Sequence, residues 1–307
     1  ILRVGSTVYI GGAFTQVNGV TRNRLAAIST TGTLEGFNPD VNSTVSSITN
    51  NGTTLYIAGS FTTVSSQSRS FIAAIDTLTG LPTSWKPSVN AAANSISVSS
   101  NNVYTGGTFL SAGNFSGGGV PIVLTTGLNV GTFAKVNGTV NAVVSDGTGG
   151  WFIGGAFTEV DGMARNNIAH LSSDGTLDAN WNPGANTTVN ALFRDGTTLY
   201  VGGAFATISS QSRAFIAALD TTTGIATAWN PTSNAAVSSI IVNGANVFVG
   251  GAFTTIGGQT RNRIAILDST TGLATAWNPN SSATVNTLLL SGGTIYVGGA
   301  FTTIGGQ

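Results

Sequence analysis

Five arginines at one recurring position are the first candidates for chemistry in this sequence. They make up nearly half of the 11 basic residues. A guanidinium carries a planar fork of donors that matches carboxylate, phosphate and carbonyl oxygens. The series predicts either a repeated anion or sugar site or a fork that ties loop carbonyls of its own repeat together. We favour the fork, because binding sites rarely recur in every repeat. The positions are Arg22, Arg69, Arg165, Arg213 and Arg261, and Gly117 replaces the arginine in the third copy.

The sequence offers few residues for other catalytic chemistry. His170 is the single histidine and cysteine is absent, which removes His-cluster and thiolate metal sites and most His-based triads. The 11 acidic residues stand mainly in turns, such as the D-x-x-T-G turns that begin at Asp76, Asp220 and Asp268. A carboxylate there can accept backbone N–H groups in an Asx-turn. The sequence therefore predicts no catalytic residue, no metal site and no bound cofactor.

A repeat of about 48 residues positions these side chains. Two independent aromatic series keep the same period, and the second is usually followed by Asn-Pro. The first series is Phe14, Phe61, Phe109, Phe157, Phe205, Phe253 and Phe301; the second is Phe37, Trp85, Phe133, Trp181, Trp229 and Trp277. The four tryptophans Trp85, Trp181, Trp229 and Trp277 are expected to fill gaps between neighbouring sheets.

Each repeat reads as four short antiparallel strands. Two apolar or alternating runs flank a short turn such as Asn51-Gly52, a third run follows, and the fourth leads to the aromatic and the proline. No stretch shows a sustained helical period. A four-stranded unit of this length is typical of a β-propeller blade. The Gly-Gly pairs that precede the phenylalanines of the first aromatic series predict close approach between neighbouring sheets or a β-bulge.

The predicted fold is therefore all-β: a single β-propeller over residues 1–307, built of four-stranded antiparallel blades. Seven blades are favoured, with six or eight as alternatives. The chain begins and ends inside a repeat, which indicates a segment of a longer protein. The predicted blades, here repeats one to six and a partial seventh, are 1–43, 44–91, 92–138, 139–187, 188–235, 236–283 and 284–307.

Composition limits the possible partners. Charged residues make up 7% of the chain, and 11 basic residues balance 11 acidic ones. Such a chain has no field to attract a phosphate backbone or an anionic membrane. No apolar run is long enough for a spanning helix. We therefore expect neither nucleic-acid binding nor direct membrane insertion.

The third repeat departs most from the others, because its segment 110–135 lacks both the arginine and the tryptophan. A position released from the repeat rules is free to acquire a function. Asn114 and Phe115 in this segment are therefore the candidate partner surface.

The chain resembles the delta-60-type repeat family of bacterial β-propellers. The resemblance is carried by units such as VYVGGAFTTIGGQTRNRIA, followed by D-x-x-T-G and W-N-P, and it covers essentially the whole sequence. It implies a propeller on a large secreted or surface-exposed bacterial protein and supplies no catalytic residues. The segment 218–229 also looks like the docking turn of quinoprotein propellers.

The function expected from the sequence is that of a non-enzymatic extracellular or cell-surface module. It would be structural, adhesive or protein-binding, with other protein subunits or surface glycans as partners. A carbohydrate-binding propeller with shallow sites lined by Asn, Thr and an exposed aromatic is the alternative. A quinoprotein-type or kelch-type oxidase is a third possibility, for which a convergent set of carboxylates and metal ligands is missing.

Overall fold

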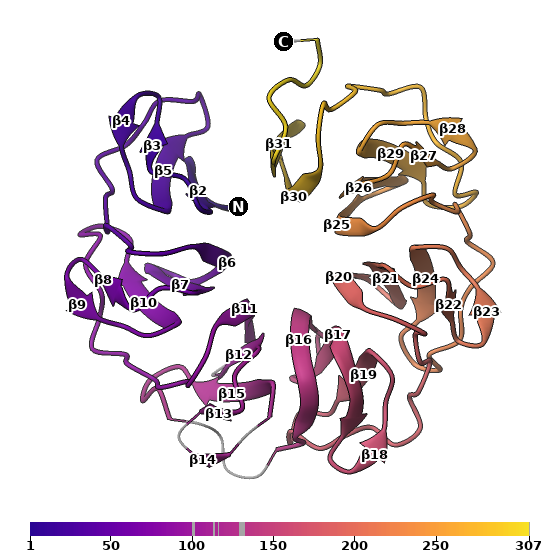
Figure 1. Ribbon diagram of the computed structural model, residues 1–307, viewed down its shortest axis with the longest axis horizontal. Helices are drawn as coiled ribbons and strands as arrows, with labels where there is room; N and C mark the ends of the chain where they lie inside the picture. The colour runs from indigo at the N-terminus through magenta and orange to yellow at the C-terminus, as the bar shows by residue number, and fades with distance from the viewer. Residues whose placement is uncertain (100–101, 113, 116, 129–132, 307) are drawn as a thin grey trace. The chain divides into compact units, whose positions relative to one another are not determined.

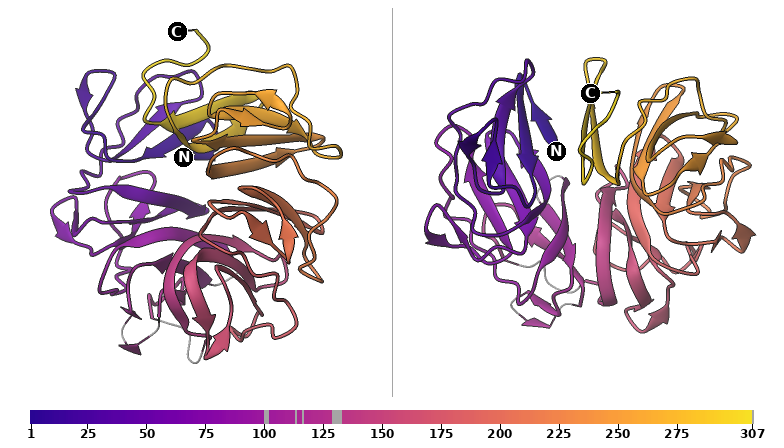
Figure 2. Two further views of the ribbon diagram at one scale, coloured as in Figure 1. Left: turned by 45° about the vertical axis from the view of Figure 1, so that its right-hand side comes forward. Right: turned by 45° about the horizontal axis from the view of Figure 1, so that its top comes forward.

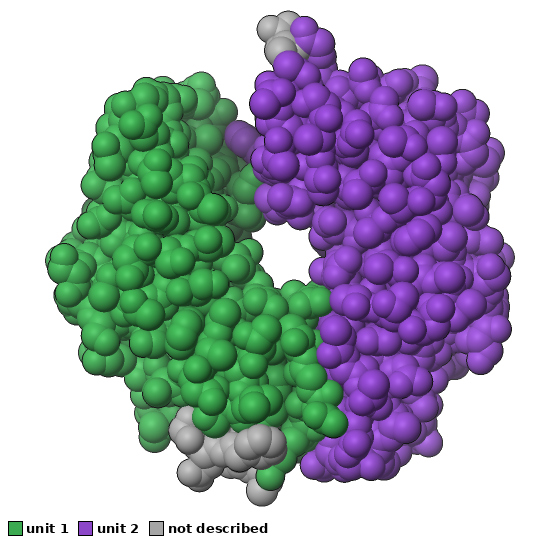
Figure 3. Space-filling view, viewed as in Figure 1, with its two compact units in different colours: residues 1–150, 173–176 green, residues 151–172, 177–307 purple. Residues whose placement is uncertain are grey.

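A computed structural model describes residues 1–99, 102–112, 114–115, 117–128 and 133–306. The chain divides into two compact units, coloured separately in Figure 3. Unit 1 comprises residues 1–150 and 173–176, and unit 2 comprises residues 151–172 and 177–307. Every regular element in the described ranges is a β-strand (Figure 1), which confirms the all-β prediction. The described residues contain no helix of the length and apolarity that a membrane span requires.

Unit 1 holds the first sixteen strands. They are β1 Leu2–Val4, β2 Thr7–Gly11, β3 Gln16–Val17, β4 Val20–Thr21, β5 Leu25–Ser29, β6 Val45–Asn51, β7 Thr54–Gly59, β8 Thr63–Val64, β9 Gln67–Ser68, β10 Ile72–Asp76, β11 Ala93–Ser99, β12 Asn102–Gly107, β13 Ser111–Ala112, β14 Asn114–Phe115, β15 Gly119–Val123 and β16 Val136–Ser145.

Unit 2 holds the others. They are β17 Trp151–Val160, β18 Met163–Ala164, β19 Ile168–Leu171, β20 Val189–Asp195, β21 Thr198–Gly203, β22 Thr207–Ile208, β23 Gln211–Ser212, β24 Ile216–Asp220, β25 Val237–Asn243, β26 Asn246–Gly251, β27 Thr255–Ile256, β28 Gln259–Thr260, β29 Ile264–Asp268, β30 Val285–Ser291 and β31 Thr294–Gly299.

The repeat builds a three-stranded antiparallel sheet with a small hairpin beside it. In repeat two the sheet order is β6-β7-β10, and β8 pairs with β9 in the hairpin. Repeat five has the same plan with β20-β21-β24 and the hairpin β22-β23 (Figures 1 and 2). The first two strands of each sheet, such as β6 and β7, follow one another in the chain and pair directly, as expected for a short hairpin connection.

The predicted fourth strand is wrong as a strand, because it makes only one bridge. In repeat two this bridge joins Ile75 to Pro82, and equivalent single bridges occur in the other complete D-x-x-T-G repeats of the described chain. The reason lies just beyond the bridge. The Thr83 hydroxyl accepts the backbone N–H of Trp85 at 3.2 Å, which turns the chain out of the ladder. Trp85 then packs against the next repeat rather than continuing the sheet.

The Gly-Gly pair serves both of the purposes expected for it. In repeat five, a Cβ on Gly202 would overlap the Val237 side chain of repeat six, so this glycine allows the two repeats to pack closely. A Cβ on Gly203 would meet the Thr188 carbonyl oxygen, at the point where the β20–β21 register shifts by a bulge. Glycine is therefore required once for close packing and once for the bulge.

Repeats two and three show how that packing can be met by another pair of residues. Ala58 stands where the other repeats have the first glycine, and the residue that faces it, Ala93, stands where they have valine. Both alanines are fully buried in one cluster. The volume added by one methyl group is offset by the smaller partner, so the interface depends on the sum of the two side chains.

Candidate functional site

The five arginines bind carbonyl groups of their own repeats. Arg69 donates through Nη1 to the Ser68 carbonyl at 2.9 Å and through Nη2 to the Thr83 carbonyl at 2.6 Å. Arg22, Arg165, Arg213 and Arg261 make the same two kinds of bond. The terminal nitrogens thus fasten the hairpin to the segment that leads to the aromatic residue. The Nε atoms are buried without a partner among the described residues, which reduces the net gain from each fork.

Gly117 occupies the place of the arginine in repeat three. Its backbone N–H donates to the Leu110 carbonyl, as the Arg69 N–H donates to the Thr62 carbonyl in repeat two. The backbone bond of this position is therefore kept while the guanidinium fork is lost.

The tryptophans join successive repeats. Trp85 donates through Nε1 to the Val123 carbonyl of repeat three at 3.1 Å, and Trp229 donates to the Asp268 carbonyl of repeat six at 3.0 Å. Each ring also stands edge-on to a tyrosine of its own repeat, with a centroid separation of 5.2 Å for both pairs. Trp181 is fully buried but its Nε1 has no partner in the described chain, and Trp277 packs edge-on to Phe248. These are contacts that hold a fold together.

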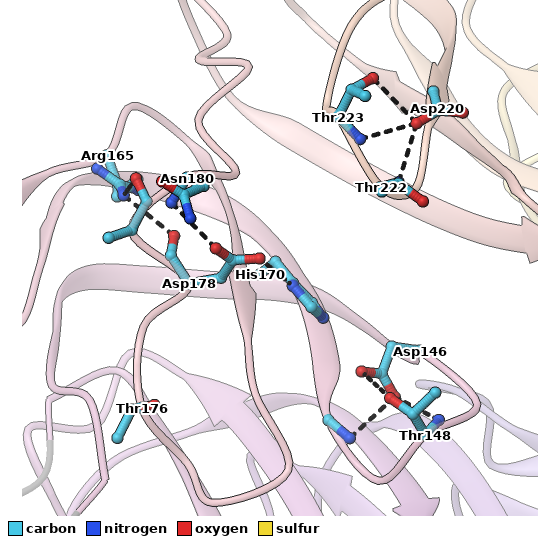
Figure 4. A network of polar contacts seen from close by, with 12 residues as sticks. Asp146, Thr148, Arg165, His170, Thr176, Asp178, Asn180, Asp220, Thr222 and Thr223 are labelled. Carbon is cyan, nitrogen blue, oxygen red and sulfur yellow. Dashed lines mark hydrogen bonds and ion pairs between the residues drawn. The ribbon is translucent and has the colours of Figure 1, made fainter.

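The D-x-x-T-G turns are closed by their aspartates. Asp220 accepts the backbone N–H groups of Thr222 and Thr223 and the Thr223 hydroxyl, as Figure 4 shows. The bonds from threonine lower the pKa of this carboxyl, and the pKa values of Asp76 and Asp268 are lowered in the same way. Gly224 at the end of the turn lies against Pro183 and Trp181 of the preceding repeat. The two signature motifs therefore meet between successive repeats.

One aliphatic side chain is left in solvent after each D-x-x-T-G turn and after the related turn of repeat three, which ends at Gly127 and lacks the aspartate. Each member of this set, here called the aliphatic set, directly follows the glycine of the turn. The members and their exposed fractions are Leu81 53%, Leu128 66%, Ile225 58% and Leu273 61%. Repeats one and four have Thr33 and Thr176 at the same place. Exposed apolar positions that recur at one site of a repeat are candidates for contact with other molecules.

Repeat four contains the one histidine–carboxylate pair of the described chain. His170 Nδ1 and Asp178 Oδ2 lie 3.0 Å apart (Figure 4), and the histidine ring stacks on Phe152 with centroids 4.5 Å apart. Burial opposes ionisation of Asp178, but the hydrogen bonds from His170 and from the N–H groups of Asn180 and Trp181 outweigh it, so the pKa of this carboxyl is lowered. The pair joins β19 to the segment that leads to Trp181.

The predicted partner surface lies beside a hollow in unit 1. Asn114 and Phe115 form β14, which pairs with β13. Ala112 of β13 lines a hollow of about 170 Å³, here called the Lys86 hollow. Its lining also includes Lys86, Pro87, Ile122, Gly127 and Leu128. Lys86 stands where repeats one, four, five and six have the asparagine of the Asn-Pro pair. The lining of this hollow therefore combines apolar side chains with one charged residue.

Sequence reasoning missed a second joint between repeats. The Asn42 side-chain oxygen accepts the backbone N–H groups of Thr62 and Thr63 in the next repeat, at 2.8 and 3.0 Å. Asn90, Asn186 and Asn234 do the same. These asparagines keep the repeat spacing, so a search for periodic polar residues would have found them. In the described residues no group of three His, Cys, Asp or Glu side chains is placed to hold a metal ion.

Comparison with known proteins agrees with this architecture. Residues 7–35, 148–180 and 246–269 match a family described as "Domain of unknown function (DUF5122) beta-propeller". The fold is similar to the WD40 β-propeller domain of Doa1, with a TM-score of 0.61 at 15% identity over 89% of this chain and 81% of that one. It is also similar to the computationally designed Ika8 protein, with a TM-score of 0.59 at 14% identity over 91% and 76% of the two chains. No curated protein sequence matches. The chain is thus an all-β protein of β-propeller repeats.

Proposed function

We propose that this chain is a non-enzymatic interaction module, structural or adhesive, in a larger secreted or cell-surface bacterial protein of the delta-60 type. In this proposal the repeats are the blades of a propeller, with seven blades favoured. The aliphatic set is the observation that carries the proposal. These side chains are more than half exposed, although the repeat tolerates threonine at the same position in repeats one and four. Removing such side chains from water on binding is the main favourable term in most protein association.

The other recurring side chains support this proposal because their polar groups are already used. The arginine forks, the aspartate turns and the asparagine joints all bind backbone groups of the chain itself. A carbohydrate site of the shallow, aromatic-lined kind would need an exposed ring. Over residues 1–99, 102–112, 117–128 and 133–306, none of the exposed large apolar side chains is aromatic. Protein is therefore favoured over glycan as the partner.

The test uses the chain immobilised and exposed to the extracellular and envelope fractions of its native source. The triple variant L81T/I225T/L273T introduces the residue that repeats one and four carry naturally. We expect the wild-type chain to retain a defined set of proteins and the variant to lose them, while both unfold at the same temperature. Leu128 is left unchanged because it lines the Lys86 hollow. Equal retention by both chains, substrate turnover or stoichiometric binding of a redox cofactor would contradict the proposal.

A further inference from the structure

Repeat two carries a second exposed apolar side chain that its sister repeats lack. Leu78 is 91% exposed in the turn Asp76–Gly80. Repeats five and six have Thr222 and Thr270 at this position. A leucine held in solvent on a turn that folds equally well with threonine is unexplained by stability, because nothing in the fold gains from its burial.

The turn also presents a negative charge beside this leucine. Asp76 Oδ1 accepts the Leu78 N–H at 3.1 Å, the Thr79 N–H at 2.7 Å and the Thr79 hydroxyl at 2.9 Å. The second carboxylate oxygen takes part in none of these bonds. The turn is therefore a rigid aliphatic knob with a carboxylate at its base.

The Lys86 hollow has the complementary character. Its lining includes the apolar side chains of Ala112, Ile122 and Leu128. Its volume of about 170 Å³ resembles that of apolar protein cavities of about 150 Å³ that accept benzene. An aliphatic side chain of four carbon atoms fits such a space. Lys86 is exposed and forms no ion pair or hydrogen bond with the described residues, so its ammonium group is available to a carboxylate.

The knob and the hollow occupy separate places on unit 1. Gly80, at the end of the knob, lies near Phe37 and Asn38 of repeat one. Gly127 of repeat three, at the hollow, lies near Lys86 and Pro87 at the end of repeat two. One copy of the chain can therefore offer its knob to a second copy while its own hollow stays open. Contacts of this heterologous kind generate rings or open chains of molecules rather than closed symmetric pairs.

We propose that the Lys86 hollow binds the Asp76–Gly80 turn of a second copy of this chain, with Leu78 in the hollow and Asp76 facing Lys86. This self-association goes beyond the proposed binding of other proteins and does not depend on Leu81, Ile225 or Leu273. A single knob buries less surface than the roughly 1,200 Å² at the lower end of stable interfaces. The assembly is therefore weak and concentration-dependent, and it weakens as salt screens the Asp76–Lys86 pair.

Analytical ultracentrifugation over a range of concentrations tests the proposal with two variants. L78T removes the knob and keeps the hollow, while K86E keeps the knob and reverses the charge at the hollow. We expect the wild-type mass to rise with concentration and each variant to associate at least about tenfold more weakly. An equal mixture of the two variants should form one-to-one pairs and nothing larger, because only one productive contact remains. I225T is the matched control and should assemble as the wild type does.

Several results would overturn the proposal. They are a wild-type chain that stays monomeric up to about 1 mM, variants that assemble as the wild type does, and a mixture of variants that fails to pair. Circular dichroism of each variant shows whether the β-fold is kept. K86N, which introduces the residue of four sister repeats, replaces K86E if the charge reversal disturbs folding. Loss of foreign partners in L81T/I225T/L273T with intact self-association would separate this inference from the proposed function.

Discussion

Repeats four and five use one framework with two different sets of side chains. In repeat five, Tyr200 lies opposite Ala218 in the sheet and Trp229 stands edge-on to the tyrosine. In repeat four, the corresponding cross-strand pair is Phe152 and His170. His170 is larger than Ala218, and Phe152 lacks the hydroxyl of Tyr200. The volume and the polarity of this pair therefore change together between the two repeats.

The two sets also differ one position further along the chain. Repeat five has Thr227 where repeat four has Asp178, and only the aspartate has a histidine within reach. Two departures from the repeat thus form one contact. The comparison shows that packed side chains in contact with one another differ together between the two repeats. At the exposed position after the turn, Ile225 of repeat five is replaced in repeat four by Thr176, whose hydroxyl donates to Asp174 within the same turn.

The largest expected effect tests whether the tryptophan holds the repeats together. Trp229→Ala should cost about 3–5 kcal/mol of unfolding free energy, because a buried ring is replaced by a cavity. Urea unfolding measures it. To sharpen the comparison, Trp229→Phe should cost about 1 kcal/mol more than Trp181→Phe, since only the Trp229 Nε1 has a carbonyl partner. Equal costs for the two phenylalanine variants would show that the bond to the Asp268 carbonyl adds nothing.

The next effect concerns the glycine that lets repeat five approach repeat six. Gly202→Ala should cost about 1–3 kcal/mol, because the new methyl group overlaps Val237. The double variant G202A/V237A copies the Ala58 and Ala93 pair and should be less destabilised than the sum of the single variants. Strict additivity in urea unfolding would mean that the two residues do not share one space.

The histidine–aspartate pair can be removed by giving repeat four the residues of repeat five. H170A and D178T should show a coupling of about 0.5–1 kcal/mol in a double-mutant cycle. The folded-state pKa of Asp178 is lowered, so its contribution to stability is present above the ordinary aspartate pKa and is lost as the pH falls through the folded value. D178T should therefore flatten the fall of stability on acidification. If the unfolding free energy of D178T fell on acidification as steeply as that of the wild type, this role would be contradicted.

The smallest effect is expected at the exposed position. Ile225→Thr transfers the repeat-four residue to repeat five and should change the unfolding free energy by no more than about 0.5 kcal/mol. Thermal unfolding measures this. A loss as large as that of a buried residue would show that Ile225 supports the fold and is not free for partners.

The sequence predicted the features whose residue types recur at the repeat spacing. The period, the absence of helix, the arginine position and the aromatic positions could all be located from residue types and spacing. The fourth strand was over-predicted because Thr83 and Trp85 look like strand residues. Their true contacts are a hydroxyl bond to the backbone and a distant carbonyl, and neither is visible in a local pattern.

The site was predicted less completely than the fold. Leu81 and its equivalents look like core residues of a fourth strand, and only the three-dimensional turn leaves them in solvent. The asparagine joints reach about 20 residues ahead, so their repeat spacing marks them but no local pattern does. The contact between His170 and Asp178 depends on the pairing of β17 with β19. The predicted partner surface at Asn114 and Phe115 remains a prediction.

The most direct test of this account measures binding and unfolding together in two variants. L81T/I225T/L273T changes only exposed side chains, while H170A/D178T changes a packed pair. The account predicts that L81T/I225T/L273T no longer retains the bound proteins and unfolds at the wild-type temperature. H170A/D178T should retain the same proteins and unfold at a lower temperature. Partner binding that survives the first variant and disappears with the second would contradict the division between packed and exposed positions.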